Sequence, residues 1–399
     1  MAQALEGIRV LEFGNFIAGP FSGMLLADMG ADVIKIERPP GGDQSRATPP
    51  RINGESASFA ALNRNKRSLV LDLKQQQARD IVLRLASNSD VFLENNRPGV
   101  MESIGLGADQ LRAVNPKIVY VSVSGFGQTG PYRRRAGVNL IIEAFSGTLS
   151  VTGEQGKMPM RPGIQTADVF GALFATYAVL TGLIGTLRER GGRVADVSLV
   201  ESSIAAAAWE TAGYLVAGEV PERLGHSHRL NAPYQLFETN DGRYLAIGTP
   251  NDELFRRLMI VLGLDSHVGD PRYSSYVLRK QNEPSLLKVV TPAIQSRSAA
   301  SLEKLLMEVG VPCAVVNNYK EVFDDPHMVA RKIAVEVEHP QMGVTRTVRN
   351  PILFDSDGPT IRRPAPLLGE HSAQILREMG HSDAEIEQLT KAAVVMLAP

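Results

Sequence analysis

Short runs rich in β-branched and aromatic residues alternate with amphipathic stretches through the first half of the chain. Strands are expected at residues 8–13, 33–37, 68–73, 91–94, 118–122 and 194–199. Helices are expected between them, from near Pro20, over 75–87 and over 109–114. Strands joined by helices pair in parallel, and the helices cover both faces of the sheet. The sequence therefore predicts an α/β fold with a Rossmann-like, doubly wound parallel sheet.

A change of composition near Gly218 divides the chain. Residues 218–233 are polar, include two prolines and show no periodicity, which indicates a linker. Beyond it, residues 234–239 and 243–247 flank Asn-Asp-Gly, a hairpin signal, and helices are expected from about 253, 286 and 301. We expect a large domain over 1–217, a linker over 218–233 and a smaller α+β domain over 234–314. The turn-rich segment 315–399 should return to the large domain and end in a helix over 372–379.

Charge and cysteine content narrow the class of protein. The 42 basic and 43 acidic residues leave a net charge of −1, so no whole-protein field attracts nucleic acid or an anionic membrane. Cys313 is the only cysteine, which excludes an intrachain disulfide. The first residues lack a signal-peptide pattern, and we expect a cytoplasmic protein acting on small molecules. Of seven histidines only His226 and His228 lie close in sequence, so no metal site is expected.

Asp168 stands at the head of an uncharged run that extends to Leu187. Asp is a favoured helix N-cap, because its carboxylate accepts free backbone N–H groups and suits the positive end of the helix dipole. The alternative is that a lone carboxylate at the start of an apolar helix is a reactive group. The run is long enough to span a membrane, but Thr176, Tyr177 and Thr181 interrupt it, and a buried core helix is expected instead.

The loops that follow the expected strands carry cations. Gly14, Gly19 and Gly23 do not form the Gly-x-Gly-x-x-Gly pattern of nicotinamide-dinucleotide binding, which argues against an oxidoreductase. Arg38 follows the second strand, where it suits a phosphate. Further patches are Arg64–Arg67 with Lys74, Asn95–Arg97, and Arg133–Arg135. Because carboxyl ends of parallel strands form the ligand crevice, Arg38, Asn95, Arg97 and Arg135 favour a polyphosphate ligand.

Ordered motifs from Leu5 to about Leu389 resemble the class III CoA-transferases of the CaiB/BaiF type, which include formyl-CoA:oxalate transferases. The matching stretches are Leu5–Phe13, Ala18–Pro20, Gly30–Arg38, Asn63–Ser68, Val91–Asn95, Gly125–Pro131, Ala232–Gln235 and Leu367–His371.

The resemblance implies specific roles. Asp168 would be the nucleophile, and CoA would be held by Phe16, Ala18, Arg38, Leu71, Lys74 and Asn95. CoA and acyl-CoA would be substrates, with no permanently bound cofactor and no metal. The resemblance also implies an interlocked homodimer in which each subunit has a large Rossmann-like domain and a small domain. Asp168 would accept the acyl group as an anhydride and then CoA as a thioester.

Departures from the oxalate enzymes limit the substrate. Ile17 replaces a Gln, residues 225–231 replace a glycine-rich flap, and Asn139-Leu140 replaces Tyr-Glu. Oxalate is therefore not expected, and the motifs are closer to branches that use succinyl-CoA or another dicarboxylic acyl-CoA.

Two alternative functions stay open. An α-methylacyl-CoA racemase-like isomerase would need a His after Arg-Ala-Gly, where this chain has Val138-Asn139. A non-catalytic CoA-binding protein would have no need of Asp168.

Overall fold

A computed structural model describes residues 3–188, 190–355 and 358–398, which form two compact units. The larger unit comprises Met1–Thr148, Pro162–Ala217 and His327–Pro399, and the smaller one Leu149–Arg161 and Gly218–Pro326. Residues 149–161 and 315–326 thus group with the smaller unit. From the sequence, residues 149–161 are expected in the large domain and residues 315–326 in the returning segment.

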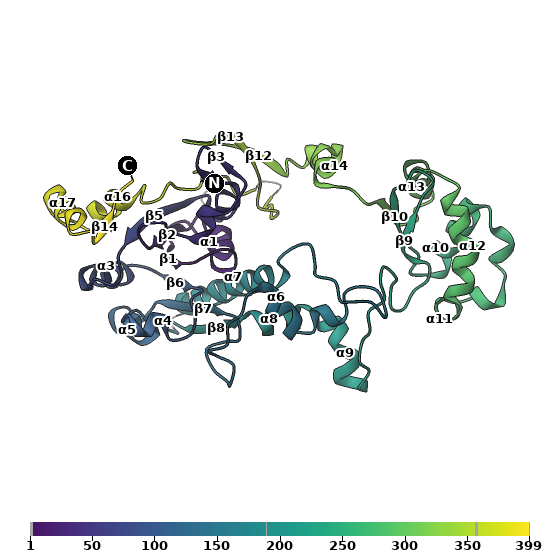
Figure 1. Cartoon of the computed structure of the whole chain (residues 1–399), viewed down its shortest axis with the longest axis horizontal. Coiled ribbons are helices and arrows are strands. Elements are labelled where there is room, and N and C mark those ends of the chain that lie inside the picture. Colours follow the sequence, from purple (N-terminus) through teal and green to yellow (C-terminus); the bar gives the residue numbers. More distant parts are fainter. Residues whose placement is uncertain (1–2, 189, 356–357, 399) are drawn as a thin grey trace. The chain divides into compact units, whose positions relative to one another are not determined.

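The larger unit contains a seven-stranded sheet (Figure 1). Its order is β14 (Val395–Met396), β5 (Lys66–Leu71), β2 (Asp32–Glu37), β1 (Arg9–Phe13), β6 (Val91–Glu94), β7 (Val119–Ser124) and β8 (Val194–Ser198). Six strands are parallel, and β14 is antiparallel to β5 at the edge. The chain runs outward from β1 through β2 and β5, then crosses to β6 and runs outward the other way. The predicted α/β fold with a large parallel sheet is confirmed.

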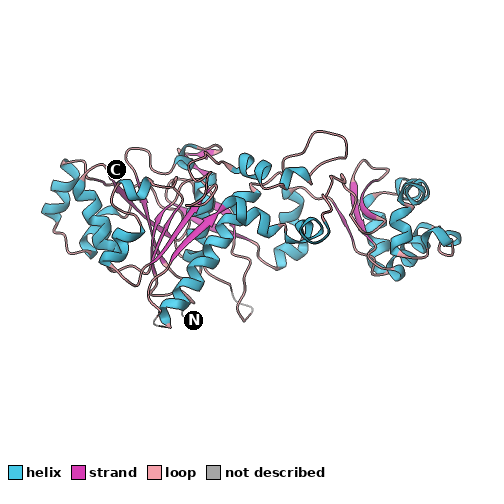
Figure 2. Cartoon of the chain, turned by 90° about the horizontal axis from the view of Figure 1, so that it is seen from below, coloured by secondary structure: helices cyan, strands magenta, loops and turns pink. Residues whose placement is uncertain are grey.

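Helices lie on both sides of this sheet (Figure 2). One apolar cluster joins it to α3 (Gln76–Ala86), α5 (Ala108–Val114), α16 (Ser372–Glu378) and α17 (Asp383–Lys391). The other joins it to α1 (Ala18–Asp28), α6 (Asn139–Phe145), α7 (Thr166–Leu187) and α8 (Leu199–Ala206). Because both faces are covered, strands such as β6 are buried at every position, as is typical of parallel sheets.

Only one side of α7 is buried, which corrects the expectation of a buried core helix. Its small residues, including Gly171, Ala175 and Gly182, face the sheet and α1. Large apolar side chains on the other side are exposed, namely Leu173, Phe174, Tyr177, Leu180, Ile184 and Leu187. Among the described residues α7 is the one helix long and apolar enough to cross a membrane by length and composition.

The smaller unit contains a three-stranded antiparallel sheet, with β10 (Tyr244–Gly248) between β9 (Tyr234–Glu238) and β11 (Cys313–Val315). The hairpin turn predicted from Asn-Asp-Gly joins β9 to β10, with Gly242 at φ +70°. One face of the sheet packs on α10 (Asp252–Leu262), α12 (Glu283–Gln295) and α13 (Ala299–Glu308).

The segment expected to be turn-rich after residue 315 contains a hairpin of β12 (Ala334–His339) and β13 (Gly343–Val348). The remaining strands and α-helices are β3 (Arg51–Ile52), β4 (Glu55–Ser56), α2 (Ala57–Asn63), α4 (Val100–Ser103), α9 (Ala208–Ala217), α11 (Tyr276–Gln281), α14 (Tyr319–Asp324) and α15 (Pro326–Ala330).

Candidate active site

A cavity of about 380 Å³ lies in the larger unit at the point where the strand order reverses. Residues 15–18 after β1, 95–98 after β6 and 123–125 at the end of β7 form its walls, together with Asn139, Asp168 and Leu199. Open α/β sheets bind ligands at this reversal point, outside the carboxyl ends of the strands. The fold therefore places Asp168 in the expected ligand crevice.

The start of α7 is capped by side chains of α6 and not by Asp168. Asn139 Oδ1 accepts hydrogen bonds from the backbone N–H groups of Ala167 at 3.0 Å and Asp168 at 3.4 Å. Glu143 Oε1 accepts from the Thr166 backbone N–H at 3.3 Å and from its hydroxyl at 2.6 Å. The helix begins at Thr166, so Asp168 is its third residue. The N-cap interpretation of Asp168 is wrong.

The Asp168 carboxylate is partly buried, and it has no hydrogen-bond donor or cation partner among the residues that the structure describes. Burial raises its pKa to about 6, and the nearby Glu143 carboxylate adds to the increase. At neutral pH most molecules therefore carry an ionised oxygen that faces the cavity without a partner. Such an oxygen needs no general base in order to attack.

The loop between β1 and α1 is held by side chains from three other elements. Asn95 Oδ1 accepts from the Asn15 backbone N–H at 2.8 Å, and its Nδ2 donates to the Asn15 carbonyl at 2.9 Å. Asp43 Oδ1 accepts from the Phe16 N–H at 3.1 Å, and Lys35 Nζ donates to the Gly14 carbonyl at 2.8 Å. Phe16 is held at φ +60°, a conformation rare for a side-chain-bearing residue, with 49% of it exposed.

Beneath this loop lies a fully buried group of charges that the sequence analysis did not find. Glu12 pairs with Lys35 at 2.9 Å and with Lys66 at 2.7 Å, and Lys35 also pairs with Asp43 at 2.9 Å. Burial lowers the pKa of Lys66 to about 8 against the opposing effect of Glu12. Glu12 in β1 and Lys35 in β2 lie between apolar residues of their strands, and this is the sequence signal that indicates a buried charged group.

The basic patch Arg64–Arg67 is structural, contrary to expectation. Lys66 and Arg67 begin β5, at the opposite end of the strand from the crevice. Arg64 pairs with Asp28 at 2.6 Å, and Arg67 pairs with Asp32 at 2.6 Å and Glu378 at 2.8 Å. All four patch residues are buried.

The structure brings six of the nine predicted site residues to the cavity, namely Phe16, Ala18, Asn95, Arg97, Arg135 and Asp168. Arg38 and Lys74 lie outside it as exposed cations that follow β2 and β5 at the same edge of the sheet. No described carboxylate pairs with either. The Leu71 side chain is fully buried in the core, so it does not line the cavity.

Arginines give the cavity a positive character. Arg97, Arg133 and Arg135 line it, and Asp168 is the only carboxylate among its described lining residues. The Arg135 guanidinium lies 5.1 Å from the ring of Phe126, 5.4 Å from that of Tyr132 and 5.2 Å from that of Phe145. Such packing orders the cation while leaving its hydrogen-bond donors available to an anion.

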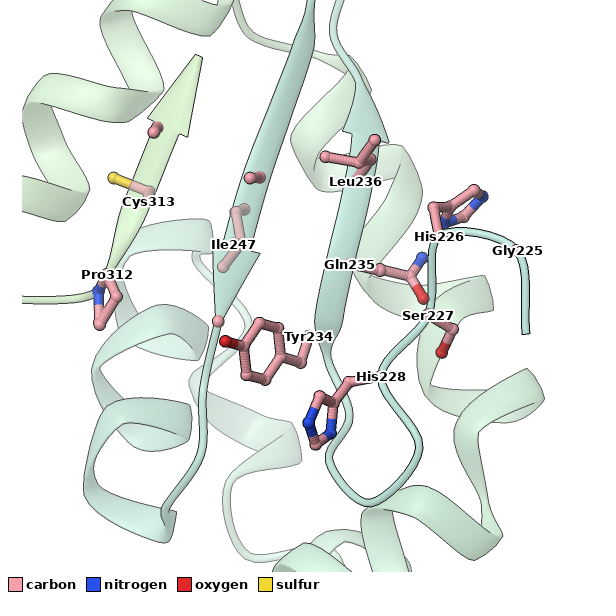
Figure 3. A pocket seen from close by; sticks show the side chains of 13 residues that line it. Gly225, His226, Ser227, His228, Tyr234, Gln235, Leu236, Ile247, Pro312 and Cys313 are labelled. Atoms are coloured by element: carbon pink, nitrogen blue, oxygen red, sulfur yellow. The ribbon is translucent and has the colours of Figure 1, made fainter. Parts of the chain in front are cut away.

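A second cavity, of about 530 Å³, lies in the smaller unit (Figure 3). Residues 225–228 and strands β9, β10 and β11 line it. The rings of His228 and Tyr234 stack with centroids 4.6 Å apart, and His228 Nδ1 accepts from the Leu230 N–H at 3.1 Å. Within the described ranges no three His, Cys, Asp or Glu residues gather as metal ligands.

Comparison with known proteins defines the class. The family model of CoA-transferase family III matches residues 5–372, so the chain belongs to this family. It is 38% identical over 382 residues to a succinate–glutarate CoA-transferase of Agrobacterium fabrum, covering 94% of this chain and 95% of that protein. It is 34% identical to a succinyl-CoA–D-citramalate CoA-transferase of Chloroflexus aurantiacus, covering 98% of each.

The fold agrees with a solved relative. The crystal structure of a CAIB/BAIF family protein from Brucella suis superposes with a TM-score of 0.85 at 33% sequence identity. The match covers 95% of this chain and 100% of that one. The predicted family and enzyme class, a class III CoA-transferase, are confirmed.

Proposed function

We propose that this enzyme moves CoA between succinyl-CoA, or another dicarboxylic acyl-CoA, and a free dicarboxylic acid, with Asp168 as nucleophile. The observation that carries the proposal is the unpartnered Asp168 carboxylate in an otherwise cationic cavity. A capping role for this residue is excluded because Asn139 and Glu143 already satisfy the helix start.

The reaction follows from what an aspartate oxygen can do. Asp168 attacks the thioester carbonyl carbon, the C–S bond breaks, and a mixed anhydride and the CoA thiolate result. The thiolate then attacks the Asp168 carbonyl carbon, the C–O bond of the anhydride breaks, and the first acid leaves as a carboxylate. The incoming acid reverses both steps from the aspartyl-CoA thioester. None of these steps changes an oxidation state, so the reaction requires no oxidant, and no step requires a metal.

CoA binding is proposed along the crevice edge of the sheet. Arg38, Lys74, Arg97 and Arg135 supply positive charge for its phosphates, since each is exposed and follows a strand or lies in a cavity loop. Phe16, Ala18 and Asn95 form the wall beside Asp168. Asn95 acts through the loop it holds, because both ends of its amide are bonded to Asn15. Leu71 would contribute only through its backbone.

The positive cavity favours substrates with a second carboxylate, and the two relatives described above are named for dicarboxylic acids. A charge-assisted hydrogen bond contributes roughly 1.5–3 kcal/mol. We therefore expect succinyl-CoA to be used at least about tenfold more efficiently, in kcat/KM, than butyryl-CoA, which lacks the distal carboxylate. Initial rates with glutarate as acceptor, and with valerate as its monocarboxylic control, test this. Equal efficiencies for the two donors would contradict the substrate proposal.

The isomerase alternative lacks a proton partner for Asp168. No histidine is among the described residues that line the cavity, and Asn139 occupies the region where the racemases carry one. The side-chain amide of Asn139 is neither an acid nor a base near neutral pH, so it cannot act as the second proton carrier that an isomerase needs. Non-catalytic CoA binding would leave the unpaired carboxylate unexplained.

We further propose that the enzyme is an interlocked homodimer, as the family resemblance implies. Support comes from apolar surface that has no cover within the larger unit. The outer side of α7 is exposed, and no residue of α9 is buried, with Trp209 76%, Leu215 75% and Val216 88% exposed. Large exposed apolar side chains in such number are usual at obligate interfaces.

Threaded subunits cannot separate without unfolding, so dilution should yield no folded monomer. We expect sedimentation velocity at nanomolar concentration to show a single dimeric species with native circular dichroism. A folded monomer under those conditions would overturn the interlocked arrangement.

A further inference from the structure

The side chain of Asn139 has an unpaired hydrogen-bond donor and lines the same cavity as Asp168. Asn139 is only 7% exposed, and its Oδ1 accepts from the N–H groups of Ala167 and Asp168. Because an amide oxygen must face these two donors, the orientation of the amide is fixed and Nδ2 points the other way. Nδ2 is buried and has no partner in the described chain.

An unpaired buried donor is unfavourable, since the group loses its hydrogen bonds to water and gains none from the protein. The capping of α7 does not require this donor, because Oδ1 alone performs it. An acceptor that becomes available only during the reaction would account for a donor kept unpaired in the resting enzyme. Asp168, whose backbone N–H is bound to Asn139 Oδ1, lines the same cavity as Asn139 and is its reacting group.

We propose that Asn139 Nδ2 donates to the Asp168 carboxyl oxygen when the chemistry places negative charge on that oxygen. The inference rests on the proposed covalent function. When the CoA sulfur attacks the Asp168 carbonyl carbon, the C=O electrons move onto Oδ and form an oxyanion. Its collapse breaks the C–O bond of the anhydride and releases the first acid. A preorganised donor lowers the barrier of this step.

The Asn139 donor should assist the steps that form and break aspartyl-CoA, and not the opening attack on the substrate. In the opening attack, charge develops on the oxygen of the substrate acyl group, and Asp168 is the nucleophile. In the steps that form and break aspartyl-CoA, charge develops on Asp168 itself. Loss of the Asn139 donor should therefore slow formation of CoA-linked enzyme more than the first release of CoA thiol.

Two variants separate the donor from other roles. Asn139→Asp keeps oxygen acceptors for Ala167 and Asp168 but removes the donor and adds charge. Asn139→Leu removes donor and acceptor without adding charge. A role limited to capping predicts a defect only in the Leu variant, and an effect of added charge predicts one only in the Asp variant. A donor role predicts the same defect in both.

The experiment is a single turnover of full-length enzyme with succinyl-CoA at pH 8, acid-quenched at successive times. Free CoA thiol is titrated, and CoA-linked protein is measured by intact mass. Glu143→Gln, which retains its Oε1 acceptor for Thr166, is the matched capping control. We expect both Asn139 variants to keep the thiol burst while CoA-linked protein forms about 10²–10³-fold more slowly. Because Asp168, with a pKa of about 6, is ionised at pH 8 with or without the Glu143 charge, the control should form both species in their wild-type ratio.

Formation of CoA-linked protein within about threefold of the wild-type rate in either variant would overturn the Asn139 inference alone. So would parallel slowing of thiol release and adduct formation in the Asp variant. If the Leu variant does not fold, the rates of thiol release and of CoA-linked protein formation in the Asp variant alone test the inference. Absence of any CoA-linked protein in the wild-type enzyme would instead refute the covalent route, and the inference with it.

Discussion

Asp168→Asn is expected to abolish CoA transfer, with a loss of at least about 10³-fold in kcat, because removing the nucleophile of a covalent mechanism leaves only binding. The side chain keeps its size but has no anionic oxygen. The affinity for CoA should change little. The melting temperature should also stay near the wild-type value, since the start of α7 is capped by Asn139 and Glu143. Steady-state transfer from succinyl-CoA, together with thermal unfolding, checks both statements.

Asp109→Asn is the matched control, because Asp109 lies in the first turn of α5 and does not line the cavity. It should retain full transfer activity. Transfer by Asp168→Asn within tenfold of wild type would remove Asp168 from the chemistry.

Glu12→Gln is expected to produce the largest loss of stability. Lys35 and Lys66 both pair with the Glu12 carboxylate, and all three side chains are wholly buried. The change leaves Lys66 without its carboxylate partner and Lys35 with Asp43 alone. Breaking a buried ion pair by removing one partner costs about 3–5 kcal/mol. Urea unfolding at a fixed protein concentration should show a much lower midpoint than that of the wild-type protein.

Glu253→Gln gives the comparison at the surface, where Glu253 pairs with the exposed side chains of Arg256 and Arg257. Its midpoint should stay at the wild-type value, as exposed pairs add little stability. Equal midpoints for the Glu12 and Glu253 variants would mean that the buried cluster is not important for stability. Because Lys35 also holds the Gly14 carbonyl, partial loosening in Glu12→Gln should weaken the loop that carries Phe16.

Much of the fold was predictable because the parallel strands are short, apolar and separated by clear helices. The bounds of β6 match the prediction, and most of its neighbours differ by one or two residues. β5 differs because it begins at Lys66, a residue that looks like surface charge in the sequence. Its burial depends on Glu12 from β1, and no local pattern reveals such a pair.

The site was predictable in part for a similar reason. Family motifs located the loops around Asp168, and six of the nine predicted residues line the cavity. The capping of α7 was not predictable, since local sequence favours an Asp cap while the real caps come from α6, a short helix without a side-chain cap of its own. The exposed side of α7 was also missed, because an apolar run by itself does not distinguish a core from an interface.

The most direct test of the central claim is to identify the modified residue. Wild-type enzyme is mixed with succinyl-CoA in the absence of acceptor, quenched in acid and digested, and the peptide that contains Asp168 is analysed by mass spectrometry. We predict CoA attached to Asp168 through a thioester, which hydroxylamine converts to the hydroxamate. The Asp168→Asn protein should carry no adduct. Turnover by the wild-type enzyme with the Asp168 peptide unmodified at every quench time would contradict the covalent function proposed for this residue.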